Sequence, residues 1–209
     1  TAPSWNQILR RFASFGLRNY HRPQRTMIMI KMFDVLYFSL LKARQDESTG
    51  TVMDVSSLSE TKLRFFQAKQ SAMVKNGIGK VVFTTICHTE ASLRDNSVCA
   101  AAFRLGIEMI RSANLDVQKQ INDSSVYEDI EGLFHENFRQ RISMIRNAII
   151  HHQEDLISND ESNHQKISEY NRHIEYALET FQYLQLIVEG HNETMQNLLR
   201  TQPNHISNI

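Results

Sequence analysis

SVCAAAFRLGIEMIRSANLDVQKQI, residues 97–121, is the stretch that decides the fold class. Its apolar residues recur at helical spacing along one face: Val98, Ala101, Ala102, Leu105 and Met109. Gly106 interrupts this helix, where glycine lowers stability unless a neighbour packs close to it. SAN at 112–114 predicts a tight turn, and Leu115, Val117 and Ile121 continue into a short helix.

The same helical periodicity extends through the rest of the chain. Glycine and proline are scarce, with 7 and 3 residues among 209, which argues against a β-rich fold. Ser59 predicts an N-cap, and Gly77 suits the left-handed position after a helix. We expect an all-α fold of stacked helix pairs, either an armadillo-like α-solenoid or a helical bundle. Besides the helices within 97–121, we expect a final helix that starts near Asn192 and helices over about 5–18, 26–45, 60–75, 78–89, 126–156 and 168–189.

Two of these helices carry apolar stripes that predict the core. The first stripe comprises Ile130, Leu133, Phe134, Phe138, Ile142, Ile145 and Ile149. The second comprises Ile174, Ala177, Leu178, Phe181, Leu184 and Val188, with Gln185 unexplained on the same face. Leu105 and Phe181 lie in the middle of their stripes, so we expect both to be buried and costly to truncate.

The apolar stretch at 27–41, MIMIKMFDVLYFSLL, predicts a buried helix. At about 1.5 Å per residue it is about 22 Å long, too short for a hydrocarbon core of about 30 Å. It also contains Lys31 and Asp34.

The overall charge balance does not point to nucleic acid or to acidic lipid, and we expect no nucleic-acid partner. Lys and Arg number 23, as do Asp and Glu, so the net charge is zero. Five arginines nevertheless precede the first acid, Asp34, and they indicate either a solvated helix face or a basic patch facing an acidic neighbour: Arg10, Arg11, Arg18, Arg22 and Arg25. The two cysteines, Cys87 and Cys99, match no zinc or redox spacing and favour a reducing, cytosolic setting.

No enzymatic motif is complete. NGIGKV at 76–81 lacks the first glycine of a phosphate loop and has Val81 in place of the Ser or Thr that would hold magnesium. CHTE at 87–90 and HHQED at 151–155 are the remaining metal candidates, and a solvated helix end is the competing interpretation of the second. We therefore expect a protein that is not an enzyme.

VEGHN at 188–192 directly follows the last long apolar stripe. In a continuous helix, side chains two positions apart point to different sides, so Glu189 and His191 can face one ion only if the helix breaks. Gly190 can supply that break. The alternative is a plain helix joint with a surface glutamate and a satisfied histidine.

Three stretches together resemble the inositol trisphosphate receptor family, and more distantly the ryanodine receptors. FRLGIEMIRSANLDVQKQI at 103–121 is similar to that family's Leu-Gly helix, GGN turn and following VQ, with Ser112 and Ala113 replacing the glycines. VYEDIEGLFHENFRQRISMIRNAI at 126–149 resembles the next helix. FQYLQLIVEGHNETMQNLLRTQ at 181–202 resembles the signature that opens the RIH-associated domain.

The resemblance implies a cytosolic segment of a homotetrameric calcium-release channel of the endoplasmic reticulum. Such a segment couples ligand and calcium binding to the pore, contacts other domains and subunits of the channel, and does not itself span the membrane. It implies that Glu189 supplies a carboxylate to an activating calcium ion and that His191 lies beside the ion, with the other ligands outside this chain. The isolated fragment is then expected to bind no calcium.

The resemblance also suggests a division of the chain into five parts. They are N-terminal helices over 1–45, a loop at 46–59, a central solenoid segment over 60–156, a polar linker at 157–168 and the start of the RIH-associated domain over 169–209. The alternatives are the equivalent segment of a ryanodine receptor, or a helical adaptor that binds partner proteins and no ion. The chain begins at Thr1 without a signal peptide, so we expect a piece of a longer protein.

Overall fold

The computed structural model describes residues 3–20, 22–88, 97–112, 114–127, 131–158, 164–190 and 192–200. Within these ranges the regular structure is helical and no strand occurs, apart from an isolated bridge between Gln45 and Val52. The all-α prediction is confirmed. The helices are α1 (Trp5–Asn19), α2 (Thr26–Arg44), α3 (Glu60–Lys75), α4 (Ile78–His88), α5 (Ser97–Ile110), α6 (Leu115–Tyr127), α7 (Glu131–Ser158), α8 (His164–Val188) and α9 (Glu193–Arg200), with short 3₁₀ turns at Pro23–Arg25 and Val55–Ser57.

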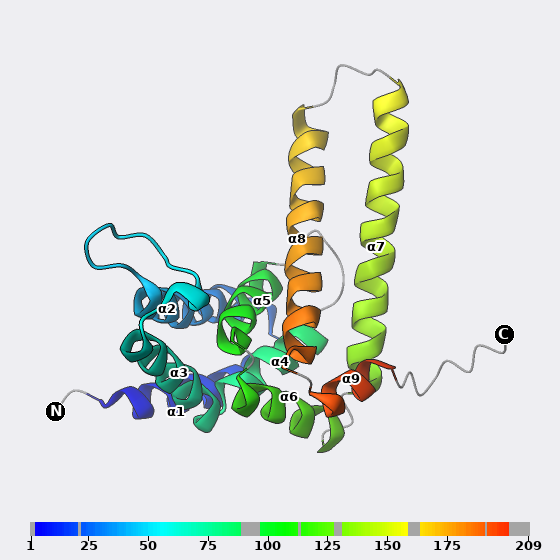
Figure 1. The fold of residues 1–209 in the computed structure, drawn as a ribbon. Helices are drawn as coiled ribbons and strands as arrows, with labels where there is room; N and C mark the ends of the chain where they lie inside the picture. The colour runs from blue at the N-terminus through cyan, green and yellow to red at the C-terminus, as the bar shows by residue number, and fades with distance from the viewer. Residues whose placement is uncertain are drawn as a thin grey trace.

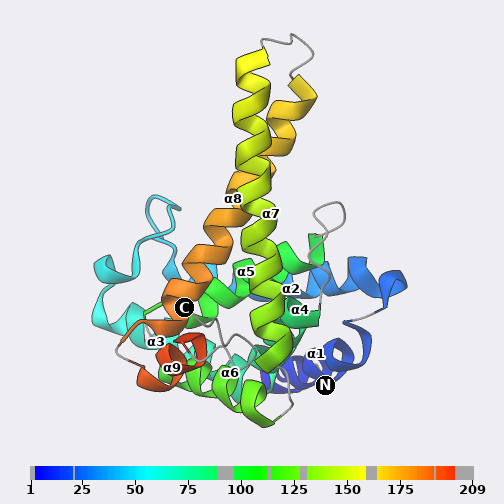
Figure 2. The same ribbon diagram turned by 90° about the vertical axis from the view of Figure 1, so that its right-hand side faces the viewer.

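The helices form a body from which one long hairpin projects. Helices α1 to α6 make up the body, and α7 and α8 run side by side away from it (Figures 1 and 2). Helix α5 packs against α2, α4 and the lower part of α8, and α9 folds back beneath α8 beside α6. The predicted division into five parts is not tested by this arrangement and stays a prediction.

Local signals placed several helix ends correctly. Ser59 caps α3 by accepting a hydrogen bond from the Lys62 amide at 3.4 Å, and Gly77 follows α3 with a φ of 85°. The expected helix over 126–156 is wrong at its start, because residues 126–127 belong to α6 and α7 begins at Glu131. Both helices are amphipathic, so a continuous apolar period cannot reveal the boundary between them.

Gly106 lies where α5 and α8 meet. A Cβ atom built on Gly106 would lie 2.7 Å from Cε2 of Tyr183 and 3.1 Å from Cγ1 of Val82. Those distances are shorter than van der Waals contact, so only glycine lets the Tyr183 ring pack against the helix backbone. The expectation that something packs close to Gly106 is confirmed.

An aromatic cluster surrounds this contact and holds α7 and α8 to α5. The Phe103 ring makes edge-to-face contacts with Tyr183 at a centroid distance of 5.3 Å and with Phe138 at 6.0 Å. The fully buried guanidinium of Arg141 lies 5.2 Å from the Phe103 ring and 5.0 Å from the Tyr176 ring. Edge-to-face rings and a cation over a ring are favourable geometries beyond simple burial of area.

The predicted core face of α8 is only partly correct, because Leu184 and Val188 pack against the core but other members of the stripe face outward. Leu178 is 64% exposed and Phe181 50% exposed, and Ile174 also faces outward. The buried face consists instead of Tyr176, Thr180, Tyr183 and Ile187, which also recur at helical spacing. Because tyrosine has both an apolar ring and a polar hydroxyl, the sequence pattern favoured the aliphatic face of α8 over the tyrosine face. The close approach of Tyr183 to Gly106 and the contacts of both tyrosines with Phe103 favour the tyrosine face, which leaves Gln185 exposed.

The stripe of α7 is only partly buried. Phe138 and Ile145 are buried as predicted, whereas Ile142 and Ile149 are largely exposed. Ile130 and the side chains of Leu133 and Phe134 lie outside the described residues. The cause is the projection of the hairpin, because in its outer part α7 packs against α8 and not against the body. An open groove along the hairpin is lined by Ile142, Ile145, Arg146, Ile149, Ile150 and Phe181.

Helix α2 is buried on one face only, which corrects the expectation of a buried helix. Its inner face contributes Met29, Met32, Phe33, Leu36 and Leu40 to the core. Met27, Val35 and Phe38 on the outer side are each more than half exposed. Within the described residues, every helix is too short or too polar to cross a lipid bilayer.

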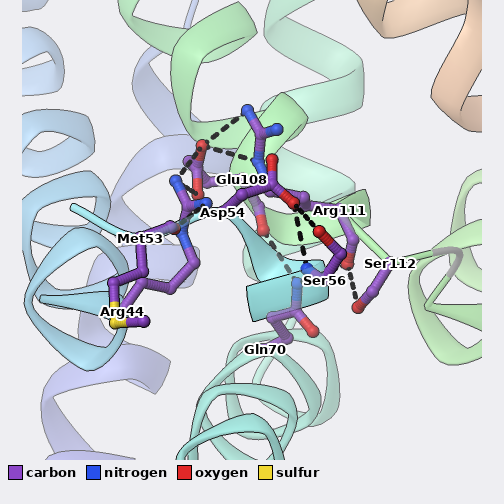
Figure 3. Close-up of polar contacts among 8 residues, drawn as sticks. All are labelled: Arg44, Met53, Asp54, Ser56, Gln70, Glu108, Arg111 and Ser112. Carbon is purple, nitrogen blue, oxygen red and sulfur yellow. Dashed lines mark hydrogen bonds and ion pairs between the residues drawn. The ribbon is translucent and has the colours of Figure 1, made fainter. Parts of the chain in front are cut away.

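A buried ion cluster joins the end of α2 to the end of α5 (Figure 3). Arg44 and Arg111 converge on the carboxylate of Glu108 at 3.0 and 2.8 Å, and Arg44 also donates to the carbonyl of Met53 at 2.9 Å. Burial lowers the pKa of the Arg44 guanidinium, and Glu108 opposes that shift. Removing Glu108 would leave a buried cation uncompensated, which is far costlier than losing an exposed pair.

Truncation of Leu105 and of Phe181 should have unequal effects. Leu105→Ala removes a fully buried side chain and should lower the free energy of unfolding by about 2–5 kcal/mol. Phe181→Ala removes a half-exposed ring and should cost about 1 kcal/mol or less. Denaturant midpoints of the two variants measure the difference. Equal losses would contradict the assignment of the tyrosine face as the buried side of α8.

Candidate functional site at the joint between α8 and α9

The candidate site is a sharp helix joint. Helix α8 ends at Val188, and Gly190 has a φ of 74°, a conformation that glycine adopts without strain. Asn192 then caps α9, because its Oδ1 accepts a hydrogen bond from the Met195 amide at 3.1 Å. The predicted break at Gly190 and the predicted cap at Asn192 are confirmed.

Gln118 of α6 holds this joint. Its Nε2 donates to the carbonyl oxygens of Leu186 at 3.1 Å and of Glu189 at 3.0 Å, and its Oε1 accepts from Asn192 Nδ2 at 3.0 Å. The side chain is fully buried. One carboxamide therefore satisfies two carbonyls at the end of α8 and the residue that caps α9, which fixes the angle between the two helices.

A second carboxamide positions the helix that carries Gln118. Asn114 caps α6 by accepting hydrogen bonds from the Asp116 and Val117 amides, and its Nδ2 donates to Gln70 Oε1 at 2.9 Å. Gln70 in turn donates to the carbonyls of Glu108 and Arg111 at 2.8 and 3.0 Å. The Gln70 side chain is fully buried on α3, directly beneath the ion cluster of Figure 3. These buried amides connect α3 and α5 to the joint through α6.

The turn between α5 and α6 is strained where the sequence lacks glycine. Ser112 has a φ of 67°, which is uncommon for any residue other than glycine, asparagine or aspartate. The Gln70 bond to the Arg111 carbonyl and the Asn114 cap hold the backbone on either side of it. The absence of glycines at 112–113, noted in the sequence, is thus compensated by tertiary hydrogen bonds.

Glu189 is exposed at the outside of the joint. Among the described residues, its carboxylate has no hydrogen bond or ion pair. His191 lies outside the described residues, so the predicted pairing of the two side chains stays a prediction. Calcium takes six to eight oxygen ligands, and Glu189 can give at most two. One carboxylate is too few ligands for a calcium ion, so the expectation of a site completed by residues outside this chain stays a prediction.

The other metal candidates receive no support from the described part of the chain. No group of three His, Cys, Asp or Glu side chains comes together there. Cys87 is buried, and burial raises the pKa of its thiol well above the ordinary value, which disfavours the thiolate that binds metals. His151 is exposed on α7, and the side chains of His88, Glu90 and Asp155 lie outside the described residues.

Gln118 is the residue that sequence reasoning missed. Its position after Val117 formed part of the VQ pattern, but that pattern carried no role for it. A polar residue next to buried Val117 and Ile121 looks like the solvated side of an amphipathic helix. Only the approach of α8 and α9 to α6 turns that side inward.

Gln118→Leu should loosen the joint selectively. The substitution leaves two carbonyls and the Asn192 amide without partners and should cost about 1–3 kcal/mol. Hydrogen exchange should accelerate at the amides of residues 189–196. Gln120→Leu is the matched control, since Gln120 bonds Val74 and Lys80 instead. It should accelerate exchange near 76–82 and not at the joint. Identical exchange patterns in the two variants would refute the role of Gln118.

The family model described as RyR and IP3R Homology associated, the RIH-associated domain, matches residues 171–209. The match covers most of α8, the joint with Glu189 and all of α9. No curated protein and no solved structure gives a significant match to the chain. The family match supports a relationship to the ryanodine and inositol trisphosphate receptors and does not distinguish between the two.

Proposed function

We propose that this chain is a non-enzymatic coupling segment of an intracellular calcium-release channel of the ryanodine and inositol trisphosphate receptor family. The observation that carries the proposal is the match over 171–209, because it includes the α8–α9 joint and the exposed Glu189 carboxylate. Resemblance of the helix region 126–149 favours an inositol trisphosphate receptor over a ryanodine receptor. The intact protein is then a homotetramer of the endoplasmic reticulum membrane, with this segment in the cytosol.

The joint has the properties that a coupling element requires. Gln118 contacts both helices of the joint, and Asn114 and Gln70 link α6 to α3 and α5. A ligand that displaced α9 relative to α8 would therefore break buried hydrogen bonds unless α6 moved as well. Because unpaired buried groups are costly, the free energy of ligand binding at the joint can be transmitted into the body.

The chemical role proposed for Glu189 is to supply a carboxylate to an activating calcium ion. A hard divalent cation prefers carboxylate oxygens, and this one is exposed and unpaired among the described residues. His191 is proposed to neighbour the ion through water, and the remaining ligands come from residues outside this chain. The angle of the joint sets the direction in which the carboxylate is presented.

The second candidate function is that of a helical adaptor without an ion site. The observation that favours it is the open apolar groove along the α7–α8 hairpin, which includes Ile142, Ile149 and Phe181. Apolar grooves of this kind accept amphipathic helices. The two functions differ in whether Glu189 influences a response to calcium.

In the full-length protein that contains this chain, Glu189→Gln should shift calcium activation to higher calcium. Loss of one charged ligand weakens a calcium site, while binding of inositol trisphosphate at a remote pocket should remain nearly unchanged. Calcium-dependent channel opening and ligand binding are measured on the same preparation.

Glu193→Gln is the matched control, because Glu193 is an exposed glutamate in the first turn of α9. It should leave calcium activation unchanged. An unaltered calcium response in a folded, ligand-binding Glu189→Gln channel would reduce this joint to a structural element and favour the adaptor function.

The isolated 209-residue chain should bind calcium weakly or not at all. Most of the ligands that calcium requires are missing, so titration calorimetry should show no saturation at micromolar calcium. Tight binding that survives Glu189→Gln would place a calcium site elsewhere in the chain and contradict the shared site.

A further inference from the structure

The outer side of α2 carries an apolar and cationic stripe with the spacing of a coiled-coil seam. Its members follow one another at intervals of three, four, three and four residues and are all exposed: Ile28, Lys31, Val35, Phe38 and Lys42. Such spacing aligns side chains along one face of a helix, over about 21 Å at 1.5 Å per residue. We call these five residues the α2 stripe.

Helix α3 widens the stripe at its C-terminal end. The Phe65 ring is exposed, and the Lys69 ammonium lies 5.2 Å from its centroid. Lys69 also donates to the carbonyl of Ser39 at 3.1 Å, which ties it to α2. Burial lowers the pKa of the Lys69 ammonium, and the nearby charge of Lys42 lowers it further. Two cations therefore lie close together, and one of them lies over an exposed aromatic ring.

The acids of α2 and α3 do not neutralise this surface. Asp34, the one acid of α2, pairs with Arg104 of α5 at 3.2 Å, and Glu60, the one acid of α3, pairs with Arg64. Among the described residues, Lys31 and Lys42 have no ion pair. The α2 stripe thus combines three large apolar side chains with two uncompensated positive charges.

The charge and the spacing together point to one kind of occupant. An apolar seam with three-and-four spacing fits another helix whose own apolar residues recur in the same way. Lysines within and beside the seam require carboxylates on that helix, because like charges would repel and neutral groups would leave the ammonium groups unpaired. A membrane surface would instead favour a broad apolar face with the cations at its margins.

We propose that the α2 stripe, with Phe65 and Lys69 of α3, is the docking surface for an acidic amphipathic helix of a partner protein. The partner helix runs along α2 for about four turns and places Glu or Asp side chains opposite Lys31, Lys42 and Lys69. This surface uses none of the residues of the α8–α9 joint, so the proposal does not depend on calcium binding.

A designed peptide tests the surface directly. The probe is a labelled helix of about 20 residues with leucine at the seam positions and glutamate beside them, and its counterpart has lysine in place of every glutamate. Fluorescence anisotropy with the 209-residue chain should show binding of the acidic peptide only. The affinity should fall as salt rises from about 50 to about 300 mM.

Paired variants assign the binding to the stripe. Lys31→Glu with Lys42→Glu should lower the affinity for the acidic peptide by roughly tenfold or more, and Phe38→Ser should also lower it. The matched control, Lys119→Glu with Arg200→Glu, reverses exposed charges on α6 and α9, which lie away from α2 in Figure 1, and should change the affinity by less than about twofold. If the double reversal does not fold by circular dichroism, Lys31→Gln with Lys42→Gln replaces it.

Three outcomes would overturn the proposal. The first is equal binding of the acidic and basic peptides. The second is an affinity for the acidic peptide that is the same in the lysine variants as in the unchanged chain. The third is binding of phosphatidylserine vesicles that requires Lys31 and Lys42 without any binding of the acidic peptide, which would assign the stripe to a membrane surface.

Discussion

The packing of Tyr183 against Gly106 is the contact on which the arrangement of the long helices depends. A side chain at position 106 would overlap the Tyr183 ring, so glycine there lets this ring of α8 pack directly against the backbone of α5. The Tyr183 ring contacts Phe103 and Phe138, and the buried Arg141 guanidinium lies over the Phe103 and Tyr176 rings, which also fixes α7. With the base of the hairpin fixed in this way, α8 ends beside α6.

The position of that end explains the polar chemistry of the body. Gln118 meets the last carbonyls of α8 and the cap of α9, and its own helix is held by Asn114 and Gln70. The ion cluster of Glu108 with Arg44 and Arg111 joins the end of α5, whose carbonyls Gln70 binds, to the end of α2. Buried polar groups are costly when unpaired, so these contacts favour a single angle at the joint.

The two outward-facing apolar surfaces have a common physical origin. The chain buries one face of α2 and one face of each hairpin helix, and the opposite faces retain large apolar side chains such as Phe38 and Phe181. Contiguous exposed apolar surface is uncommon on proteins that act alone and marks contact sites. The α2 stripe also carries uncompensated lysines, whereas Arg146 is the only charged residue that lines the hairpin groove.

The sequence by itself determined the helical class, most helix ends and the break at Gly190, because spacing, caps and glycine act within a few residues of each other. It also pointed to Glu189 as a candidate ligand, which stays a prediction, and to the resemblance that the family match over 171–209 supports. Only the tertiary structure decided which face of α8 is buried, how much of the α7 stripe is covered, and why Gln118 matters. Each of these depends on a neighbour distant in the chain: Gly106 opposite Tyr183, the body that covers only the base of the hairpin, and the end of α8 beside α6. Apolar periodicity indicates that a helix is amphipathic, but the element that packs against the helix determines which face is buried.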